Sequence, residues 1–296
     1  MECYVDVSGD VRLWVEQSGR REGSPLLLVM GANSSGVAWP DELVARLGEH
    51  HRVVRYDHRD TGRSTWAFDQ QPYAVADLAR DAVAVLDGLG IDRAHVVGMS
   101  MGGTLAQLLL LDHPDRLLSA TILATAVLEG AGPDGAPAPF GDIDPRLLAL
   151  WERLADPRSR EEEIAFRVEH WRLLNGDEVP FDADEFHRLE EHVVDHTGRH
   201  DNPAAHARAD QSGLDRGAEL ASVAVPTLVV EAPADPINPP PSAARIADAI
   251  PGADLVTIPG MGHALGSPVV VPLAEAILEH TRRVDVTDGS ADATGR

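Results

Sequence analysis

The first 126 residues alternate between short apolar runs and longer stretches in which apolar residues recur at helical spacing. Continuous apolar runs of this kind are typical of strands that are buried on both faces. The run at 26–30 predicts such a strand, and shorter, mostly apolar runs predict strands at 53–56, 94–97 and 120–123. The amphipathic stretches predict a helix that opens at Pro40 and further helices over 76–89 and 101–111. This alternation predicts an α/β fold with a mostly parallel sheet flanked by helices.

The amino terminus adds a different element. The segments 4–7 and 11–15 are rich in valine and flank a Ser-Gly-Asp turn. Such a pattern predicts a β-hairpin. We expect it to form an antiparallel edge of the sheet.

The strand–helix rhythm stops after Ala126. Residues 130–145 are rich in glycine, proline and aspartate, and 146–217 carry helical patterns without strands. The rhythm resumes with strands at 227–230 and 255–258 and helices at 243–250 and 273–282.

The domain organisation follows from this interruption. We expect an α/β core formed by 1–126 and 221–283, with an inserted helical cap at 127–220. The small, polar residues of 284–296 predict a disordered tail.

Composition narrows the class of protein. The chain has 296 residues, of which 44% are hydrophobic, which fits one α/β domain with an insertion. Its formal net charge of −23 disfavours nucleic acid and anionic lipid as partners, because phosphates would be repelled. The sequence contains no lysine, which excludes Schiff-base chemistry.

Cysteine content and hydropathy bear on the compartment. The single cysteine, Cys3, excludes an intramolecular disulfide and a cysteine-based metal site. No apolar run approaches the roughly 20 residues of a membrane span. The amino terminus has no apolar leader segment. We therefore expect a cytoplasmic protein without a membrane partner.

The stretch HVVGMSMGGT at 95–104 places Ser100 between Gly98 and Gly102, where a predicted strand ends and a predicted helix begins. A turn this tight exposes its apical side chain and tolerates only small neighbours, as in a nucleophile elbow. The N–H of Met101 would then point at a developing oxyanion, supported by the helix dipole. The alternative is a glycine-rich turn with an N-capping serine. In its strand–turn–helix context the pattern predicts a catalytic nucleophile.

A serine nucleophile needs a base, and in this arrangement the acid and the histidine follow it along the chain, each after a strand. The strand at 227–230 runs into Asp235, and the strand at 255–258 runs into a glycine loop that carries His263. Glu231 is a second candidate for the acid. The alternatives are an Asp-Pro turn residue and a surface histidine.

The loop after the strand at 26–30 should supply a second N–H to the oxyanion. We expect the amide of Ala32 in this role, with that of Gly31 as second choice. Asn33 is a candidate substrate-binding residue, or alternatively only caps the loop. We interpret the polar loop 57–64 mainly as a scaffold that braces the elbow and the oxyanion loop.

The cap contains two further candidates. Trp171 is a candidate substrate contact, although packing within the cap is the default interpretation for its aromatic residues. His192, His196 and His200 recur at the spacing of a helical metal pair, but Gly198 would interrupt that helix. We favour a solvated polar face and expect no metal ion. No dinucleotide-binding motif is present, and we expect no cofactor.

Several of these stretches together resemble the α/β-hydrolase family over residues 4–283. They are LLLVMGANSS, VVRYDHRDTGRST, AVAVLDGLGIDRAHVVGMSMGGT, DHPDRL, FRVEHWRLLNG, VPTLVV and IPGMGHAL. The Val-Met-Gly opening and the cap segment are similar, more narrowly, to the aclacinomycin methylesterase group of anthracycline-tailoring enzymes.

The resemblance implies that Ser100, Asp235 and His263 form a catalytic triad, with the amides of Ala32 and Met101 as the oxyanion hole. It implies a serine carboxylesterase of antibiotic biosynthesis. Its partner would be a small hydrophobic substrate, the methyl ester of a polyketide-derived aromatic, anthracycline-like compound. Decarboxylation of the free acid is an open second step.

The residues alone support only serine ester or amide hydrolysis. Two alternatives within the fold are a general carboxylesterase and a cofactor-free perhydrolase. A more remote alternative is a hydrolase-like receptor for a small molecule. The oligomeric state is not predicted.

Overall fold

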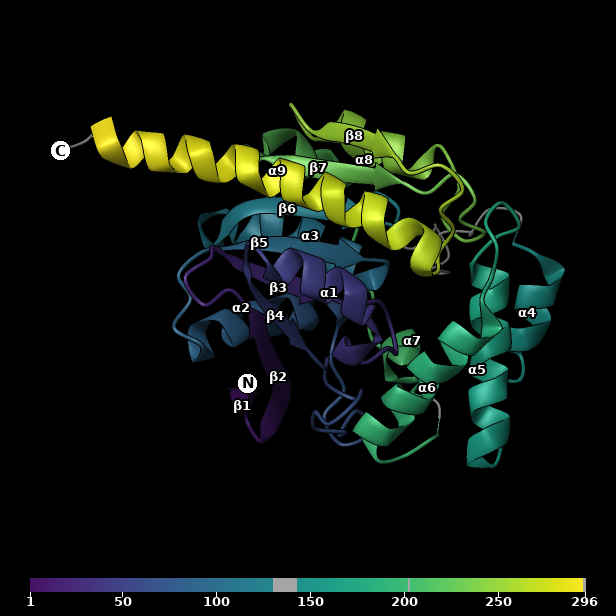
Figure 1. Ribbon diagram of the computed structural model, residues 1–296. Coiled ribbons are helices and arrows are strands. Elements are labelled where there is room, and N and C mark those ends of the chain that lie inside the picture. Colours follow the sequence, from purple (N-terminus) through teal and green to yellow (C-terminus); the bar gives the residue numbers. More distant parts are fainter. Residues whose placement is uncertain (130–142, 202, 295–296) are drawn as a thin grey trace.

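The computed structural model describes residues 1–129, 143–201 and 203–294. Within these residues one sheet contains eight strands in the order β1-β2-β4-β3-β5-β6-β7-β8 (Figure 1). The strands are β1 Glu2–Ser8, β2 Val11–Gly19, β3 Pro25–Val29, β4 Arg52–Tyr56, β5 Ala94–Met99, β6 Leu117–Leu123, β7 Thr227–Glu231 and β8 Asp254–Thr257. The pairs β1–β2 and β2–β4 are antiparallel, and the other pairs are parallel. The predicted mostly parallel sheet with an antiparallel hairpin at its edge is confirmed.

Helices cover both faces of the sheet, and apolar side chains fill the space between the layers. One face packs against α1 Asp41–Gly48 and α9 Ser267–Thr294. The other face packs against α2 Val75–Gly88, α3 Met101–Asp112 and α8 Ser242–Ala249. All six residues of β5 are buried, including His95, and the other five are apolar or small. None of the helices in the described ranges is long and apolar enough to cross a membrane.

The helices between β6 and β7 stand to one side of the sheet (Figure 1). The cap contains α4 Pro145–Trp151, α5 Arg160–Leu174, α6 Ala183–Thr197 and α7 Ala205–Arg208. Three short 3-10 helices are η1 Gly36–Ala38, η2 Pro114–Arg116 and η3 Gly217–Ser222. Most of the predicted glycine- and proline-rich linker, 130–142, lies outside the described residues.

The cap contacts loops that follow the carboxyl ends of the strands. Helix α6 packs on η1, which follows β3. The N–H of His263, which follows β8, donates to the carbonyl of Leu174 at 2.7 Å. The cap is therefore in direct contact with the predicted catalytic edge of the core.

The carboxyl terminus differs from the expected disordered tail, because α9 runs through to Thr294. Val284 is buried, and the Asp285 carboxylate accepts the Ser24 hydroxyl at 2.8 Å and contacts His95 Nε2 at 3.1 Å. These partners belong to distant parts of the chain. The composition of the tail alone does not reveal them.

Candidate active site

Ser100 lies at the turn between β5 and α3, with a φ of 55° and a ψ of −123°. A positive φ is strained for a residue other than glycine. A Cβ on Gly98 would overlap the carbonyl oxygen of Gly102, and a Cβ on Gly102 would overlap that of Val29. The Ser100 N–H donates to the carbonyl of Leu123 at 3.0 Å and so holds the turn on the neighbouring strand. Close backbone approach therefore requires the two glycines of the elbow.

The structure brings the predicted nucleophile, base and acid together. His263 Nε2 lies 3.1 Å from Ser100 Oγ, and His263 Nδ1 lies 2.8 Å from Asp235 Oδ2. The other oxygen of Asp235 accepts the N–H groups of Ile237 at 2.8 Å and Asn238 at 3.0 Å. Burial opposes ionisation of Asp235, but His263 and the two backbone donors outweigh it and lower its pKa. The ionised carboxylate keeps the proton of His263 on Nδ1, which leaves Nε2 to accept the serine proton.

Glu231, the second candidate for the acid, has another partner. Its carboxylate accepts the Thr257 hydroxyl at 2.9 Å, across the β7–β8 pair. The acid in contact with His263 is therefore Asp235, which lies in the loop that follows Glu231, the last residue of β7.

The two predicted oxyanion amides flank Ser100. A Cβ on Gly31 would lie 3.2 Å from Ser100 Cβ and 3.6 Å from its Oγ, so the loop after β3 passes beside the nucleophile. Met101 is the first residue of α3, where helix geometry leaves the amides unpaired. In the described part of the chain, neither the Ala32 N–H nor the Met101 N–H donates to another protein group. Both amides are therefore left without a protein partner among these residues, and their role as the oxyanion hole stays a prediction.

A family model for the alpha/beta hydrolase fold matches residues 24–266. The chain belongs to the α/β-hydrolase family. Two relatives are rhodomycin D methylesterase DauP of Streptomyces sp. (strain C5) and rhodomycin D methylesterase DnrP of Streptomyces peucetius. Each is 47% identical over 97% of this chain and 100% of its own length. Among solved structures, a hydrolase from Pseudomonas aeruginosa has a TM-score of 0.69 and 26% identity, over 94% of this chain and 97% of that chain.

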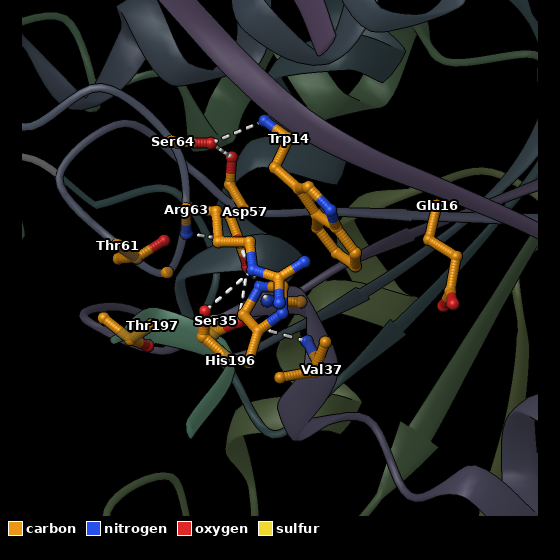
Figure 2. A network of polar contacts seen from close by, with 12 residues as sticks. Trp14, Glu16, Ser35, Val37, Asp57, Thr61, Arg63, Ser64, His196 and Thr197 are labelled. Carbon is orange, nitrogen blue, oxygen red and sulfur yellow. Dashed lines mark hydrogen bonds and ion pairs between the residues drawn. The ribbon is translucent and has the colours of Figure 1, made fainter. Parts of the chain in front are cut away.

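In this α/β hydrolase the loop after β4 braces the loop after β3. The Asp57 carboxylate is fully buried and accepts four donors, shown in Figure 2. One oxygen accepts the Ser35 hydroxyl and the Gly36 N–H at 2.8 Å; the other accepts the Arg63 N–H at 2.8 Å and lies 2.7 Å from His196 Nε2. These contacts agree with the scaffold interpretation of this polar loop. They also extend it, because one of the four donors comes from the cap.

The three cap histidines lie against different groups and share no metal site. His196 is buried and packs edge-on against Trp14, with ring centroids 4.4 Å apart. His200 Nε2 lies 3.2 Å from the carbonyl oxygen of Arg158 within the cap, whereas His192 is exposed. The prediction of a solvated face is wrong for His196, because its partners come from the distant core.

Asn33 is fastened to the cap by two hydrogen bonds. Its N–H donates to His206 Nδ1 at 2.8 Å, and its side-chain oxygen accepts the His206 N–H at 3.2 Å. These contacts favour the loop-capping alternative for Asn33 over substrate binding. Sequence reasoning missed His206, which lies 173 residues away in the chain and carries no local signal.

Trp171 lies in the interface between α5 and α6. Its Nε1–H donates to a Glu190 oxygen at 2.6 Å, and its ring lies 5.6 Å from that of Phe186. These contacts agree with packing inside the cap, the default interpretation for this residue.

The neighbouring His170 lies near enough to the catalytic histidine to be affected by its charge. It stands one helical turn before Leu174, whose carbonyl binds the His263 loop. Its Nε2 accepts the Trp151 indole N–H at 2.9 Å. Burial, and then the charge of His263, lower the pKa of His170 to about 4. A neutral imidazole that accepts at Nε2 carries its proton on Nδ1.

One group of potential metal ligands in the described ranges lies at the opposite edge of the sheet, near the amino ends of β4 and β5. The ligand atoms of His51, His95 and Asp285 lie within 4.8 Å of one another. Every ring nitrogen of the two histidines already has a hydrogen-bond partner, including Ser24 for His51 and Ser119 for His95. We interpret the group as a set of hydrogen bonds that holds α9 against the sheet.

Proposed function

We propose that this hydrolase is a serine carboxylesterase that cleaves the methyl ester of a polyketide-derived, anthracycline-like substrate. The observation that carries the proposal is the 47% identity to two rhodomycin D methylesterases over 97% of the chain. That likeness extends through the cap, the part of the fold that covers the catalytic edge. The contact between Ser100, His263 and Asp235 supplies the chemistry.

In the first half of the proposed reaction, Ser100 Oγ attacks the ester carbonyl carbon while His263 Nε2 takes its proton. The carbonyl oxygen becomes an oxyanion, which accepts the N–H groups of Ala32 and Met101. Asp235 stabilises the imidazolium that forms. His263 then donates this proton to the methoxy oxygen, so that methanol leaves and an acyl-enzyme remains.

In the second half, water attacks the acyl carbon and His263 accepts the proton of that water. Collapse of the second tetrahedral intermediate breaks the bond to Ser100, and His263 returns the proton to Oγ. The products are the carboxylic acid and the free enzyme. This scheme needs neither metal nor cofactor, and it gives Asp235 a constant role as the ionised partner of His263.

Substrate choice falls to the cap in this proposal. The triad and the oxyanion amides all belong to the core, whereas His170, whose pKa is affected by the charge of His263, belongs to α5 of the cap. An apolar, multi-ring substrate fits the general rule that such sites are mostly apolar with a few polar groups. We place the reaction in the cytoplasm, because a chain with one cysteine makes no use of an oxidising compartment.

The test is a substrate panel analysed by mass spectrometry. The purified enzyme is incubated with a set of anthracycline methyl esters and, separately, with nitrophenyl acetate. We expect free acid and methanol from at least one polycyclic ester, with a higher kcat/KM than for the acetate. Hydrolysis of the acetate alone would favour a general carboxylesterase. Binding without turnover of any ester would favour a receptor.

The same panel reports on decarboxylation. A product lighter than the free acid by carbon dioxide, formed at a rate that depends on enzyme concentration, would place that second step on the enzyme. Its formation at the same rate after the enzyme is removed would place it in solution.

A further inference from the structure

The oxyanion loop, residues 30–36, is held at three points. At its start, His58 Nε2 lies 3.0 Å from the carbonyl oxygen of Met30. At its end, Asp57 accepts Ser35 and Gly36. Among the described residues, the middle of the loop makes its hydrogen bonds to a residue of the cap, His206, through the N–H and the side-chain oxygen of Asn33.

The hydrogen bonds of His206 define its tautomer. Nδ1 accepts the Asn33 N–H, and Nε2 lies 3.0 Å from the carbonyl oxygen of Arg59, to which it must donate. Burial, and then the nearby His58, lower the pKa of His206 to about 3. The ring is therefore neutral at any working pH, and Nδ1 is permanently an acceptor.

His206 is itself held by the core. The backbone of Asp210, four residues after His206, exchanges hydrogen bonds with the start of α2: its carbonyl accepts the Val75 N–H at 2.8 Å, and its N–H donates to the carbonyl of Tyr73 at 3.2 Å. Figure 1 shows α7 on the side of the cap that faces the sheet. The acceptor offered to Asn33 is thus fixed in space.

The contact between Asn33 and His206 lies next to Ala32, whose N–H is expected to bind the oxyanion. Asn33 directly follows Ala32, and its φ of 58° makes a sharp left-handed bend at this point. The Asn33 N–H belongs to the peptide group on the carboxyl side of Ala32. An acceptor that fixes this peptide also restricts the rotation that would swing the Ala32 N–H away from the oxyanion.

We propose that His206 is a positioning residue that holds the Ala32 N–H toward the transition-state oxyanion. It acts through the Asn33 N–H and touches neither substrate nor nucleophile. The proposal rests on the proposed esterase function. It means that the core oxyanion hole is complete only when α7 of the cap is docked.

Two substitutions separate this role from general packing. In His206→Asn, the amide oxygen lies the same number of bonds from Cα as Nδ1 of the histidine. This variant therefore keeps the acceptor for the Asn33 N–H and loses the donor to the Arg59 carbonyl. Glutamine matches Nε2 in the same way, preserves that donor and loses the acceptor. His200→Gln is the matched control, because His200 bonds only within the cap.

Steady-state kinetics with nitrophenyl acetate measure the effect. Removal of one oxyanion donor lowers kcat by about 10²–10³-fold. We expect His206→Gln to lower kcat about 10- to 100-fold with KM changed less than about threefold, and His206→Asn to keep kcat within about threefold. Affinity for a trifluoromethyl ketone, which forms an oxyanion on the serine, should fall in parallel with kcat/KM.

A purely structural role predicts a different result. Both variants would then lower the melting temperature, and kcat of the folded fraction would match that of wild type and of His200→Gln. Equal loss of kcat in the Asn and Gln variants would also overturn the proposal. The two proposals can fail separately. If the wild-type enzyme does not hydrolyse polycyclic methyl esters, the proposed substrate is refuted, but the role of His206 is still tested with nitrophenyl acetate.

If His206→Gln does not fold, the wild-type enzyme gives the test by NMR. The chain has four asparagines, so selective isotopic labelling of asparagine gives few backbone amide signals. The Asn33 amide signal should shift when the trifluoromethyl ketone binds. An unchanged Asn33 signal in the inhibited enzyme would contradict the proposal.

Discussion

The fully buried carboxylate of Asp57 offers the sharpest test of how the catalytic loops are held. We consider the substitution Asp57→Asn, which keeps the shape of the side chain and replaces one oxygen by an NH2 group. In wild type each oxygen accepts two donors, one of which is a backbone N–H. In either orientation of the asparagine, the N–H of Gly36 or of Arg63 therefore faces an NH2 group.

The expected loss of stability follows from the number of donors that lose their acceptor. The remaining donors adjust, since the Ser35 hydroxyl rotates and His196 can change tautomer. A backbone N–H cannot adjust, and an unsatisfied buried donor costs about 1–3 kcal/mol. Loss of the negative charge further weakens the bonds that remain, because charge-assisted bonds are about twice as strong as neutral ones. We expect Asp57→Asn to lower the free energy of unfolding by about 3 kcal/mol.

Urea unfolding measures this loss. With an m-value of about 3 kcal/mol per molar urea, the midpoint should fall by about 1 M. The matched control is Asp248→Asn, which makes the same change at an exposed site on α8 and should stay within about 0.5 kcal/mol of wild type. A midpoint for Asp57→Asn no lower than that of the control would refute the bracing role of this carboxylate.

Three further outcomes follow from the site. Asp235→Asn should lower kcat for nitrophenyl acetate by about 10⁴-fold, because the histidine loses its required tautomer, whereas Glu231→Gln should leave kcat nearly unchanged. His170→Leu should change the ratio of kcat/KM between a polycyclic methyl ester and nitrophenyl acetate by about tenfold, while Trp171→Phe should lower the melting temperature and leave that ratio unchanged. The pKa of His206 is about 3 in the fold, below the ~6.5 of an exposed histidine, so unfolding takes up a proton. The contribution of the neutral His206 side chain to the free energy of unfolding is therefore fully present above about pH 6.5. Below that pH the free energy of unfolding falls by about 1.4 kcal/mol per pH unit. Urea unfolding at neutral and mildly acidic pH should show a shallower dependence for His206→Gln than for wild type.

Much of the candidate site could be predicted from local patterns. Ser100 is marked by a strand, two glycines and a helix, and Asp235 and His263 each follow a strand. Because the carboxyl ends of parallel strands meet at one edge, these local signals also predict that the three side chains lie together. The distances around His263 agree with that expectation.

The contacts between cap and core could not be predicted in this way. The partners of His196 and His206 lie 139 and 173 residues away, and neither histidine stands in a recognisable motif. The expected solvated face at His196 and the expected tail after Arg283 have the same physical cause. In both places local composition predicts exposure, and the contact that fixes the segment, with Asp57 for His196 and with His95 for Asp285, comes from a distant part of the chain.

In the proposed reaction Ser100 attacks the methyl ester of a polycyclic aromatic substrate. The most direct test compares wild type with Ser100→Ala on an anthracycline methyl ester in water enriched in the heavy oxygen isotope. For wild type we predict that the acid carries the heavy isotope and the methanol does not, because the acyl–oxygen bond is the one broken. For Ser100→Ala we predict the same fold by circular dichroism and a kcat at least about 10³-fold lower. A Ser100→Ala rate close to wild type, or heavy isotope in the methanol, would contradict nucleophilic attack by Ser100 on the ester carbonyl.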